Sequence, residues 1–465
     1  MGRLVVVSNR VALPGETATG GLANGLRSAL RKRRGLWFGW SGEVVERVGE
    51  AATACEGGIE YLLTDLSATE HERYYLGFSN RILWPLCHYR PSLLDYSRPD
   101  FIGYWDVNRR LAQLLAPRLV HDDTLWVHDY HLLPLGQELR EAGIGVRSGF
   151  FLHVPFPPSP LVEMLPHHEL LFSALASYDL IGVQTADDAQ CLRTYLEGIG
   201  GVSGDDGSVR MPDGRLTRVK AFSIGIDAAA VAEKAERAPL SDEFRRLDAS
   251  LEGRKLVIGV DRLDYSKGLP QRFEAFGRFL GRHEHWRARV SYLQIAPPSR
   301  EDLPEYRDLQ HQLEQLAGAT NGQFADPHWV PIRYVNRSYS HDVLAGYYRM
   351  ADVGLVTPLR DGMNLVAKEF IAAQPPEDPG VLVLSCFAGA ARELDGALVI
   401  NPVDQEDIVE TLHKALEMPL HDRKARWQAL WKQVCTNTID TWSNGFLAEL
   451  EGAPQRSREP DRTAA

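Results

Sequence analysis

The sequence predicts an α/β protein built from two doubly wound sheets. Short apolar runs rich in Val, Ile and Leu, with little polar alternation, are typical of buried parallel strands. Amphipathic stretches lie between the runs, and this alternation of strands and helices indicates doubly wound sheets. One sheet rarely holds so many strands, so we expect two. The runs span residues 4–7, 125–127, 149–152, 180–183, 256–260, 290–295, 353–356 and 381–384.

The segments between these strands divide the chain. A helical pattern begins at Leu22, and the Gly- and Asp-rich segment 201–215 is expected to form a surface hairpin or loop. We expect a domain boundary near 224–240, because a fresh series of strands and helices begins after it. Late in the chain, residues 407–418 predict an amphipathic helix whose apolar face holds Ile408, Leu412, Ala415 and Leu416.

Composition excludes several classes of protein. The chain has 465 residues, 44% of them hydrophobic, and its net charge is −11 (51 basic and 62 acidic). This composition is typical of a globular protein and excludes a disordered chain. The acidic balance argues against nucleic-acid binding, and no apolar stretch is long enough to span a membrane. Five widely spaced cysteines fit reduced thiols in a cytoplasmic protein rather than a disulfide framework.

The first strand ends in polar residues that are candidates for anion binding. Ser8-Asn9-Arg10 follows the strand, and the loop after it closes in Gly20-Gly21 just before a helix. In open α/β sheets, ligands bind outside the carboxyl ends of the strands, and glycines before a helix let backbone N–H groups approach an anion. The loop therefore either holds a phosphate or sugar with Arg10 as its cation, or is a surface loop with a glycine turn.

A second polar loop follows the strand at 256–260. Arg262 and Lys267 lie five residues apart in DRLDYSKG, ahead of a predicted helix. A bidentate arginine and a point-charge lysine suit a diphosphate. Alternatively, the two cations are surface partners of Asp261 and Asp264.

The strand at 353–356 leads to a third candidate turn, within PLRDGMNLVAKE at 358–369. Gly362 permits a positive φ beside a helix start, where N–H groups and the helix dipole favour an anion. Glu369, one turn into the helix, could accept two vicinal ribose hydroxyls, and Asp361 a sugar hydroxyl. The alternative is a helix capped by Asp361 with Glu369 exposed.

Histidines and aromatic residues complete the candidates. His153 follows a strand and precedes a proline-rich segment, where it either meets a substrate hydroxyl or packs against backbone. His128 and His131 lack further ligands for a metal site, and the sequence has no D-x-D motif for a nucleotide-sugar metal ion. Aromatic clusters in the first half are expected to be core more often than sugar-stacking surfaces. They are Trp37-Phe38-Gly39-Trp40, Tyr74-Tyr75 and Trp84.

Taken together, these segments resemble the trehalose-6-phosphate synthase family of retaining GT-B glycosyltransferases, glycosyltransferase family 20. The resemblance covers residues 3 to about 450, and motifs this long in this order are highly specific. They are LVVVSNR (4–10), GGL (20–22), GLWFGWSGE (35–43), YYLGFSN (74–80), LWP (83–85), HDYHLLP (128–134), FFLHVPFP (150–157), DRLDYSKGLP (261–270), QIAPPSR (294–300) and VGLVTPLRDGMNLVAKEF (353–370).

The resemblance implies a GT-B fold of two Rossmann-like domains facing an interdomain cleft. An N-terminal acceptor-binding domain would span 1–230, with a helix at 438–451 crossing back to it. A C-terminal nucleotide-sugar domain would span 231–437, and 452–465 would be a mobile tail. The implied reaction moves glucose from UDP-glucose to glucose 6-phosphate with retention, giving α,α-trehalose 6-phosphate and UDP, without a cofactor or metal.

Residue roles follow from the matching motif positions. Donor-binding positions are Gly21 in a mobile N-terminal loop, Arg262, Lys267, Asp361, Gly362, Met363, Asn364, Leu365, Val366 and Glu369. Acceptor-binding positions are Arg10, Trp40, Tyr75, Trp84, Asp129 and Arg300. The catalytic set comprises Arg262, Lys267, His153, Asp129 and Asp361.

Two other functions stay open at this point. One is a glucosylglycerol-phosphate synthase-like transferase with another phosphorylated acceptor, and the other is an inactive sugar-phosphate sensor. UDP is the family's usual donor nucleotide, although sequence alone does not separate it from GDP or ADP. Family members are often homo-oligomers, so a dimer or tetramer is expected.

Overall fold

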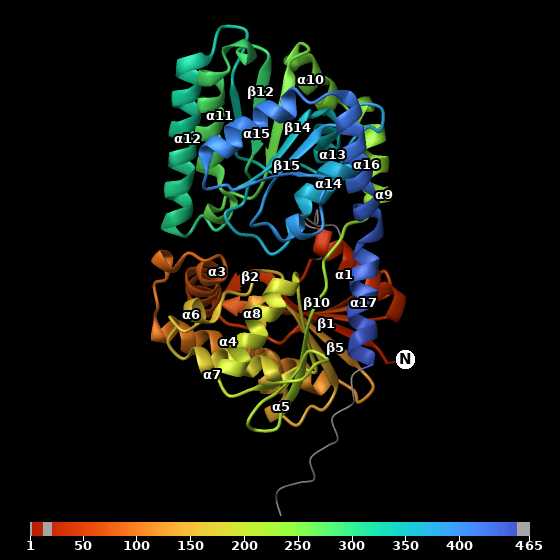
Figure 1. Cartoon of the computed structure of the whole chain (residues 1–465). Coiled ribbons are helices and arrows are strands. Elements are labelled where there is room, and N and C mark those ends of the chain that lie inside the picture. Colours follow the sequence, from red (N-terminus) through yellow and green to blue (C-terminus); the bar gives the residue numbers. More distant parts are fainter. Residues whose placement is uncertain (1, 13–20, 453–465) are drawn as a thin grey trace, which may run out of the picture. The chain divides into compact units, whose positions relative to one another are not determined.

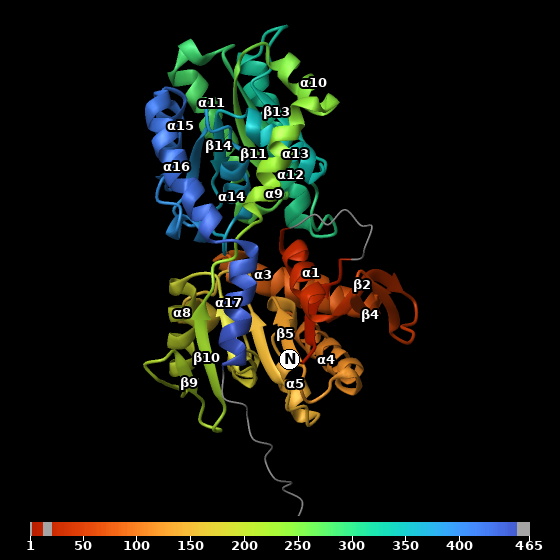
Figure 2. The same ribbon diagram turned by 90° about the vertical axis from the view of Figure 1, so that its right-hand side faces the viewer.

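The computed structural model describes residues 2–12 and 21–452. The chain divides into two compact units (Figures 1 and 2). Unit 1 comprises Met1–Ser223 with Asp440–Ala465, and unit 2 comprises Ile224–Ile439. The expected tail at 452–465 lies outside the described residues, apart from Gly452. No helix in the described part of the chain is long and apolar enough to cross a membrane.

Unit 1 contains one ten-stranded sheet in the order β3-β4-β2-β1-β5-β6-β7-β10-β9-β8. The strands from β4 to β10 in this order pair in parallel, and antiparallel pairs extend both edges. The central strands are fully buried because helices cover them, as their continuous apolar sequence requires. The bounds are β1 (Leu4–Arg10), β2 (Leu36–Val45), β3 (Ala52–Glu56), β4 (Ile59–Ser67), β5 (Thr124–His128), β6 (Arg147–Phe151), β7 (Leu180–Val183), β8 (Val202–Ser203), β9 (Ser208–Arg210) and β10 (Leu216–Ala221).

The helices of unit 1 connect these parallel strands. A π-helix, η1 (His71–Leu83), is the unusual element, and the N–H of Trp84 at its end donates to the carbonyl of Ser79, five residues back. Segments with this hydrogen-bond pattern are rare and are often found at functional sites. The longer α-helices are α1 (Gly21–Arg33), α4 (Arg98–Leu115), α5 (Leu135–Glu141) and α8 (Ala186–Gly198); shorter ones are α2 (Ala68–Glu70), α3 (Trp84–Cys87), α6 (Ser159–Val162) and α7 (His168–Ser173).

The last helix, α17 (Ile439–Glu451), packs on the sheet of unit 1 (Figure 1). Its Phe446 ring stacks on Trp126 of β5, with centroids 4.8 Å apart. Gly149 and Gly182 make room for that ring, since a Cβ on either glycine would lie 2.7 Å from it. Glu449 then forms ion pairs with Arg218 (2.6 Å) and Lys220 (2.8 Å) of β10.

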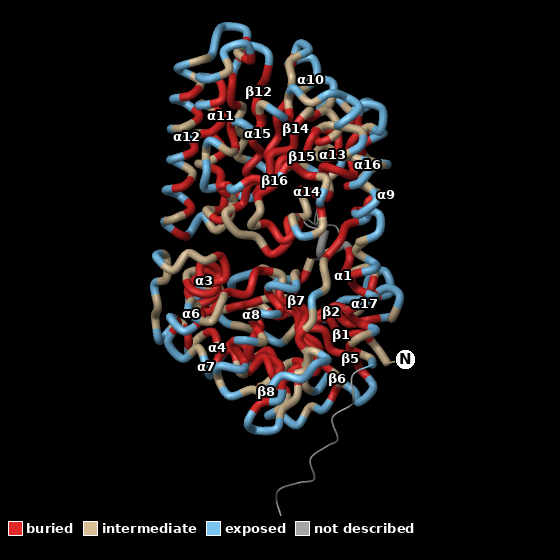
Figure 3. The backbone as a smooth tube through the Cα atoms, in the orientation of Figure 1, coloured by how far each residue is buried: buried red, intermediate tan, exposed pale blue. Residues whose placement is uncertain are grey.

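Unit 2 contains a six-stranded parallel sheet in the order β13-β12-β11-β14-β15-β16. Buried strands form its centre, with helices around them (Figure 3). The strands are β11 (Lys255–Val260), β12 (Val290–Ile295), β13 (Ile332–Val335), β14 (Val353–Val356), β15 (Val381–Ser385) and β16 (Leu398–Ile400). The helices are α9 (Ala228–Arg237), α10 (Asp242–Leu251), α11 (Leu269–Arg282), α12 (Pro304–Phe324), α13 (His341–Met350), α14 (Leu365–Ala373), α15 (Gln405–Leu416) and α16 (Leu420–Thr436).

The expected elements are present. Seven of the eight apolar runs lie wholly within parallel strands, and the run at 149–152 extends one residue beyond β6; the strands belong to two separate sheets. Strands β8 and β9 form the hairpin expected at 201–215. Helix α15 buries Ile408, Leu412 and Ala415 as predicted, but it ends at Leu416 rather than 418. All five cysteines are described and free, as expected for reduced thiols.

Candidate active site

The loop between β11 and α11 holds two of the candidate cations. Arg262 is exposed, whereas Lys267 lies at the end of a short 3₁₀ turn that Asp264 caps by accepting from the N–H of Ser266. Gly268 then turns into α11 with φ +66°. A Cβ at this glycine would lie 2.2 Å from the carbonyl oxygen of Thr357, so only glycine fits between the loop and β14's end.

A buried arginine that the sequence analysis missed holds this loop in place. Arg272 of α11 is fully buried. Its guanidinium donates to the Asp261 carboxylate (2.8 Å), the Thr357 hydroxyl (2.9 Å) and the carbonyl of Lys267 (3.0 Å). One side chain therefore joins the start and end of the β11–α11 loop to the residue that follows β14.

The turn between β14 and α14 carries the other donor candidates. Gly362 is not in the positive-φ region, so the sequence prediction for this residue is wrong. The left-handed residue is Asn364, with φ +89°, and its side chain caps α14 by accepting from the N–H of Ala367 at 3.2 Å. The alternative, a cap by Asp361, is also wrong because Asn364 is the residue that caps α14. Gly362 instead lies against Gly389, where a Cβ would be 1.9 Å from the Gly362 carbonyl oxygen.

Asp361 connects the two loops. Its Oδ2 atom accepts from Lys267 Nζ at 2.5 Å and from Asn364 Nδ2 at 3.1 Å. The side chains of Lys267 and Asp361 are only 12% and 14% exposed, so solvent screens this pair weakly. A lysine, an aspartate and a capped helix start thus meet at the carboxyl ends of two neighbouring strands, where ligands bind in open α/β sheets.

Glu369 is one turn further along α14. Burial raises the pKa of its carboxyl group to about 7, and Lys234 opposes this increase. No hydrogen bond joins the carboxyl group to another residue in the described ranges. A partly buried carboxyl group that lacks internal partners is suited to accept hydrogen bonds from ligand hydroxyls.

Arg300 lies in unit 2, in a second buried polar cluster. Its Nη1 atom donates to Asp264 Oδ2 at 2.9 Å and lies 2.6 Å from the Tyr306 hydroxyl. The Arg300 side chain is 6% exposed, and its backbone has φ +50°. Asp264 therefore positions both the Lys267 turn, through the cap at Ser266, and the guanidinium of Arg300.

In unit 1, the end of β1 places Arg10 against β2. Its guanidinium packs on Gly42, which has φ +99° and where a Cβ would lie 2.9 Å from Arg10 Nε. Asn9, one residue earlier, accepts a hydrogen bond from the Tyr74 hydroxyl of η1 at 2.8 Å. The end of β1 is thereby tied both to β2 and to the π-helix.

The candidate aromatic residues form a continuous cluster. Trp40 of β2 lies 5.4 Å from Tyr75 of η1, and Tyr75 stacks on His131 at 6.0 Å with 13° between the ring planes. His131 contacts Tyr130, which lies 5.7 Å from Trp84. The π-helix therefore places Tyr75 against both Trp40 and His131. Trp40 and Trp84 are buried, at 7% and 4% exposed.

Asp129 and His153 follow two adjacent parallel strands, β5 and β6. Asp129 has φ +74°, and its carboxylate accepts from the N–H of His153 at 3.2 Å. His153 Nε2 lies 3.1 Å from His128 Nδ1, while its Nδ1 is 3.4 Å from Gln184 Nε2. Burial lowers the pKa of His153 to about 3, so the ring is neutral near pH 7. The long contact to Gln184 leaves Nδ1 as the ring nitrogen best able to exchange its partner for a substrate hydroxyl.

Comparison with known proteins decides the family. The model of glycosyltransferase family 20 matches residues 7–452. The trehalose-6-phosphate synthase of Sinorhizobium fredii is 48% identical over 466 residues, covering 98% of this chain and 100% of that protein. This chain belongs to glycosyltransferase family 20.

Solved structures of relatives agree with the fold. The α,α-trehalose-phosphate synthase (UDP-forming) of Burkholderia vietnamiensis has a TM-score of 0.96 at 46% identity, covering 97% of both chains. The Burkholderia xenovorans enzyme, in complex with glucose 6-phosphate, has a TM-score of 0.93 at 47% identity, covering 97% of this chain and 100% of that one. The expected GT-B fold, with two parallel-sheet domains, is confirmed.

The family 20 motifs thus form two groups of side chains, one in each unit. Unit 2 brings together Lys267, Asp361 and Asn364, with Glu369 one helical turn away and Arg262 on the same loop as Lys267. Unit 1 joins Trp40, Tyr75 and Trp84 in one ring cluster, and Asp129 with His153 in another contact. Gly21 begins α1, while residues 13–20 of the expected mobile loop lie outside the described residues.

Proposed function

We propose that this chain transfers glucose from UDP-glucose to glucose 6-phosphate with retention, forming α,α-trehalose 6-phosphate and UDP. The observation that carries this proposal is the joined donor turn of unit 2, where Lys267, Asp361 and the α14 start meet beside Glu369. Near-full-length similarity to trehalose-phosphate synthases, at 44–48% identity, supports the same activity. The Escherichia coli relative, solved with UDP-2-fluoro glucose at 42% identity, supports UDP as the nucleotide.

On this proposal, unit 2 binds the donor. Arg262 and Lys267 neutralise the diphosphate, and the N–H groups at the start of α14, from Met363 to Val366, favour the same anion. Glu369 accepts the ribose hydroxyls. Asp361, which holds Lys267 in position, accepts a hydroxyl of the glucosyl group.

Unit 1 binds the acceptor. Arg10 supplies a guanidinium for the 6-phosphate, and the ring cluster of Trp40, Tyr75 and Trp84 surrounds the phosphorylated sugar. Arg300 of unit 2 provides a second guanidinium, oriented by Asp264. The Asp129 carboxylate accepts hydrogen bonds from sugar hydroxyls, and the neutral ring of His153 can accept one or donate one.

The chemical step follows from these charges. The bond between the glucosyl C1 and the β-phosphate oxygen breaks, and the acceptor's anomeric oxygen forms the new bond to C1 on the same face. The acceptor's proton passes to the departing β-phosphate oxygen, so no protein acid is required. Arg262, Lys267 and the start of α14 stabilise the negative charge that grows on UDP. His153, neutral near pH 7, contributes hydrogen bonds rather than a proton.

The test is UDP release from UDP-glucose with glucose 6-phosphate, with glycerol 3-phosphate and without an acceptor. We expect release only with glucose 6-phosphate. Release only with glycerol 3-phosphate would favour a glucosylglycerol-phosphate synthase, and no release from UDP-, GDP- or ADP-glucose would favour an inactive sensor.

We also propose a homo-oligomer, dimer or tetramer, in the cytoplasm, where both phosphorylated substrates occur. Analytical ultracentrifugation at several concentrations tests the oligomeric state, and a monomer throughout would contradict it.

A further inference from the structure

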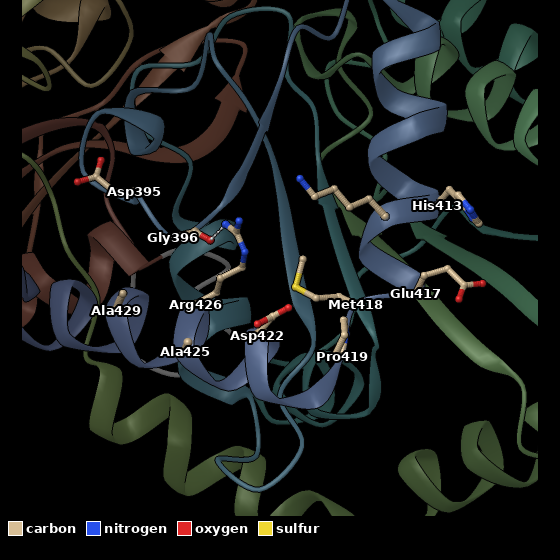
Figure 4. Close-up of a pocket in the computed structure, with 11 residues that line it drawn as sticks. Asp395, Gly396, His413, Glu417, Met418, Pro419, Asp422, Ala425, Arg426 and Ala429 are labelled. Atoms are coloured by element: carbon tan, nitrogen blue, oxygen red, sulfur yellow. Dashed lines mark hydrogen bonds between the residues drawn. The ribbon is translucent and has the colours of Figure 1, made fainter.

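A cluster of histidines in unit 2 is separate from the donor turn. His283 and His285 follow α11, and His413 lies in the last turn of α15, with Glu417 directly after that helix. Ligand atoms of His285, His413 and Glu417 all lie within 4.8 Å of one another. His413 and Glu417 also line a pocket of about 700 Å³, and Figure 4 shows both projecting from the same side of α15.

The spacing of these atoms suits a metal ion. A tetrahedral zinc ion with ligands at 2.0–2.1 Å separates each pair of ligand atoms by about 3.4 Å. His285 Nε2 and Glu417 Oε1 are already 3.4 Å apart. Their side chains are 51% and 54% exposed, so an ion can enter from solvent and keep a water as a further ligand. The ligand atom of His413 lies within 4.8 Å of the other two, so a shift of at most about 1.4 Å brings it to tetrahedral spacing.

Ring nitrogens without hydrogen-bond partners are an independent indication that an ion or water binds at this cluster. His413 Nδ1 and His283 Nε2 are both buried without a hydrogen-bond partner in the part of the chain that the structure describes. The two rings stack with centroids 4.0 Å apart and 16° between their planes, so His283 supports the His413 ring from behind. Buried polar atoms without partners are uncommon and often mark a place where water or an ion binds.

The surroundings add favourable charge. His413 is in the last turn of α15, where the negative end of the helix dipole favours a cation. The nearby Arg282 opposes a cation, but it is paired with Glu406 and Glu410.

We propose that His285, His413 and Glu417 form a binding site for a transition-metal ion of the zinc class. Two imidazoles and one carboxylate suit Zn²⁺ and its neighbours better than Mg²⁺ or Ca²⁺, which prefer oxygen ligands. The site joins the end of α11 to the end of α15. Because α11 begins at the donor loop and has 14 residues, its far end is about 21 Å from that loop. The ion would therefore stabilise unit 2 without taking part in glucosyl transfer.

Calorimetric titration of untagged, chelator-treated protein with Zn²⁺ tests the site. We expect one ion per chain, and H285A, H413A and E417Q should each weaken binding at least tenfold. H311A is the matched control, because His311 lies 3.7 Å from Glu314 on α12 but belongs to no such cluster. Turnover should stay unchanged in the three variants.

Two further measurements make the result specific. Co²⁺ should give the intense visible absorption of a tetrahedral site in the wild type and lose it in E417Q, an exposed substitution that leaves the core intact. Zn²⁺ should raise the melting temperature of the wild type and of H311A only. Absence of Zn²⁺ binding by the wild type, or unchanged affinity in H285A and E417Q, would overturn the proposal.

Discussion

Lys267 Nζ lies 2.5 Å from Asp361 Oδ2, although the two residues are 94 positions apart in the chain. The pair joins the β11–α11 loop to the β14–α14 turn, and both side chains are largely shielded from solvent. The aspartate also accepts from Asn364, the residue that caps α14. One carboxylate therefore positions both Lys267 and the start of α14, the two groups that we propose stabilise the leaving diphosphate.

Replacing Lys267 tests the role of this pair. In K267A we expect kcat to fall by about two decades, because a fixed charge that stabilises the leaving group is lost. The matched control is K255A, since Lys255 pairs with Asp352 at 2.6 Å at the other end of β11. Steady-state kinetics of both variants give the comparison, and an equal loss in K255A would contradict a specific role for Lys267.

Arg262 offers a test with little structural cost. It is exposed, so R262A should leave the melting temperature nearly unchanged while kcat falls by about two decades. Steady-state kinetics and thermal denaturation of the same preparation separate the two effects. A variant with wild-type kcat would contradict the proposed role of Arg262 in stabilising the leaving group.

Glu369 should make donor binding depend on pH. Its pKa is raised to about 7, so the carboxylate that we propose accepts the ribose hydroxyls forms as pH rises through 7. The Kd for UDP-glucose should therefore increase about tenfold from pH 8 to pH 6. Calorimetry at several pH values measures this dependence, since the diphosphate of UDP-glucose does not titrate in that range.

The E369Q variant supplies the contrast for this prediction. Its Kd for UDP-glucose should be higher than that of the wild type at pH 8 and nearly independent of pH. Glu377, an exposed residue after α14, gives the control variant E377Q, which should keep the wild-type profile. The same pH dependence in E369Q would assign it to another group.

Arg300 is expected to affect both substrate binding and stability. R300A should raise the KM for glucose 6-phosphate more than that for UDP-glucose, because a guanidinium is lost from the acceptor phosphate. It should also lower the melting temperature, since the fully buried carboxylate of Asp264 loses an ion-pair partner. The double variant R300A/D264N should recover part of the stability but not the acceptor KM. A change in the donor KM alone would show that the acceptor assignment is wrong.

Arg272 should be mainly structural. R272M leaves the buried carboxylate of Asp261 unpaired, and we expect a loss of about 3–5 kcal/mol in the free energy of unfolding. Chemical denaturation measures this loss. Adding D261N should restore part of it, and an unchanged stability of R272M would contradict the proposed network.

The sequence predicted the centre of both sheets well, because buried parallel strands are unbroken apolar runs. The runs at 180–183, 290–295 and 353–356 match β7, β12 and β14 residue for residue. The sequence does not predict strand β2, since Gly, Trp and Ser interrupt it and its pattern indicates only an aromatic cluster. Its parallel neighbours, β1 and β4, supply the pairing that its composition does not signal.

The candidate site was predictable where motif residues follow predicted strands, as with Lys267 and Asp361. The supporting residues were not, because they depend on contacts between distant segments. Arg272 has the sequence of an ordinary surface arginine, yet Asp261, Gln294 and Thr357 enclose it. Similarly, the left-handed conformation belongs to Asn364 rather than Gly362, because its side chain both caps α14 and donates to Asp361.

Proton NMR of the product formed from UDP-glucose and glucose 6-phosphate shows whether glucose is transferred and whether its α configuration is retained. We expect a phosphorylated disaccharide with two α-anomeric protons, together with one equivalent of UDP. A β-anomeric proton at the transferred glucose, or free glucose as the only sugar product, would contradict this expectation.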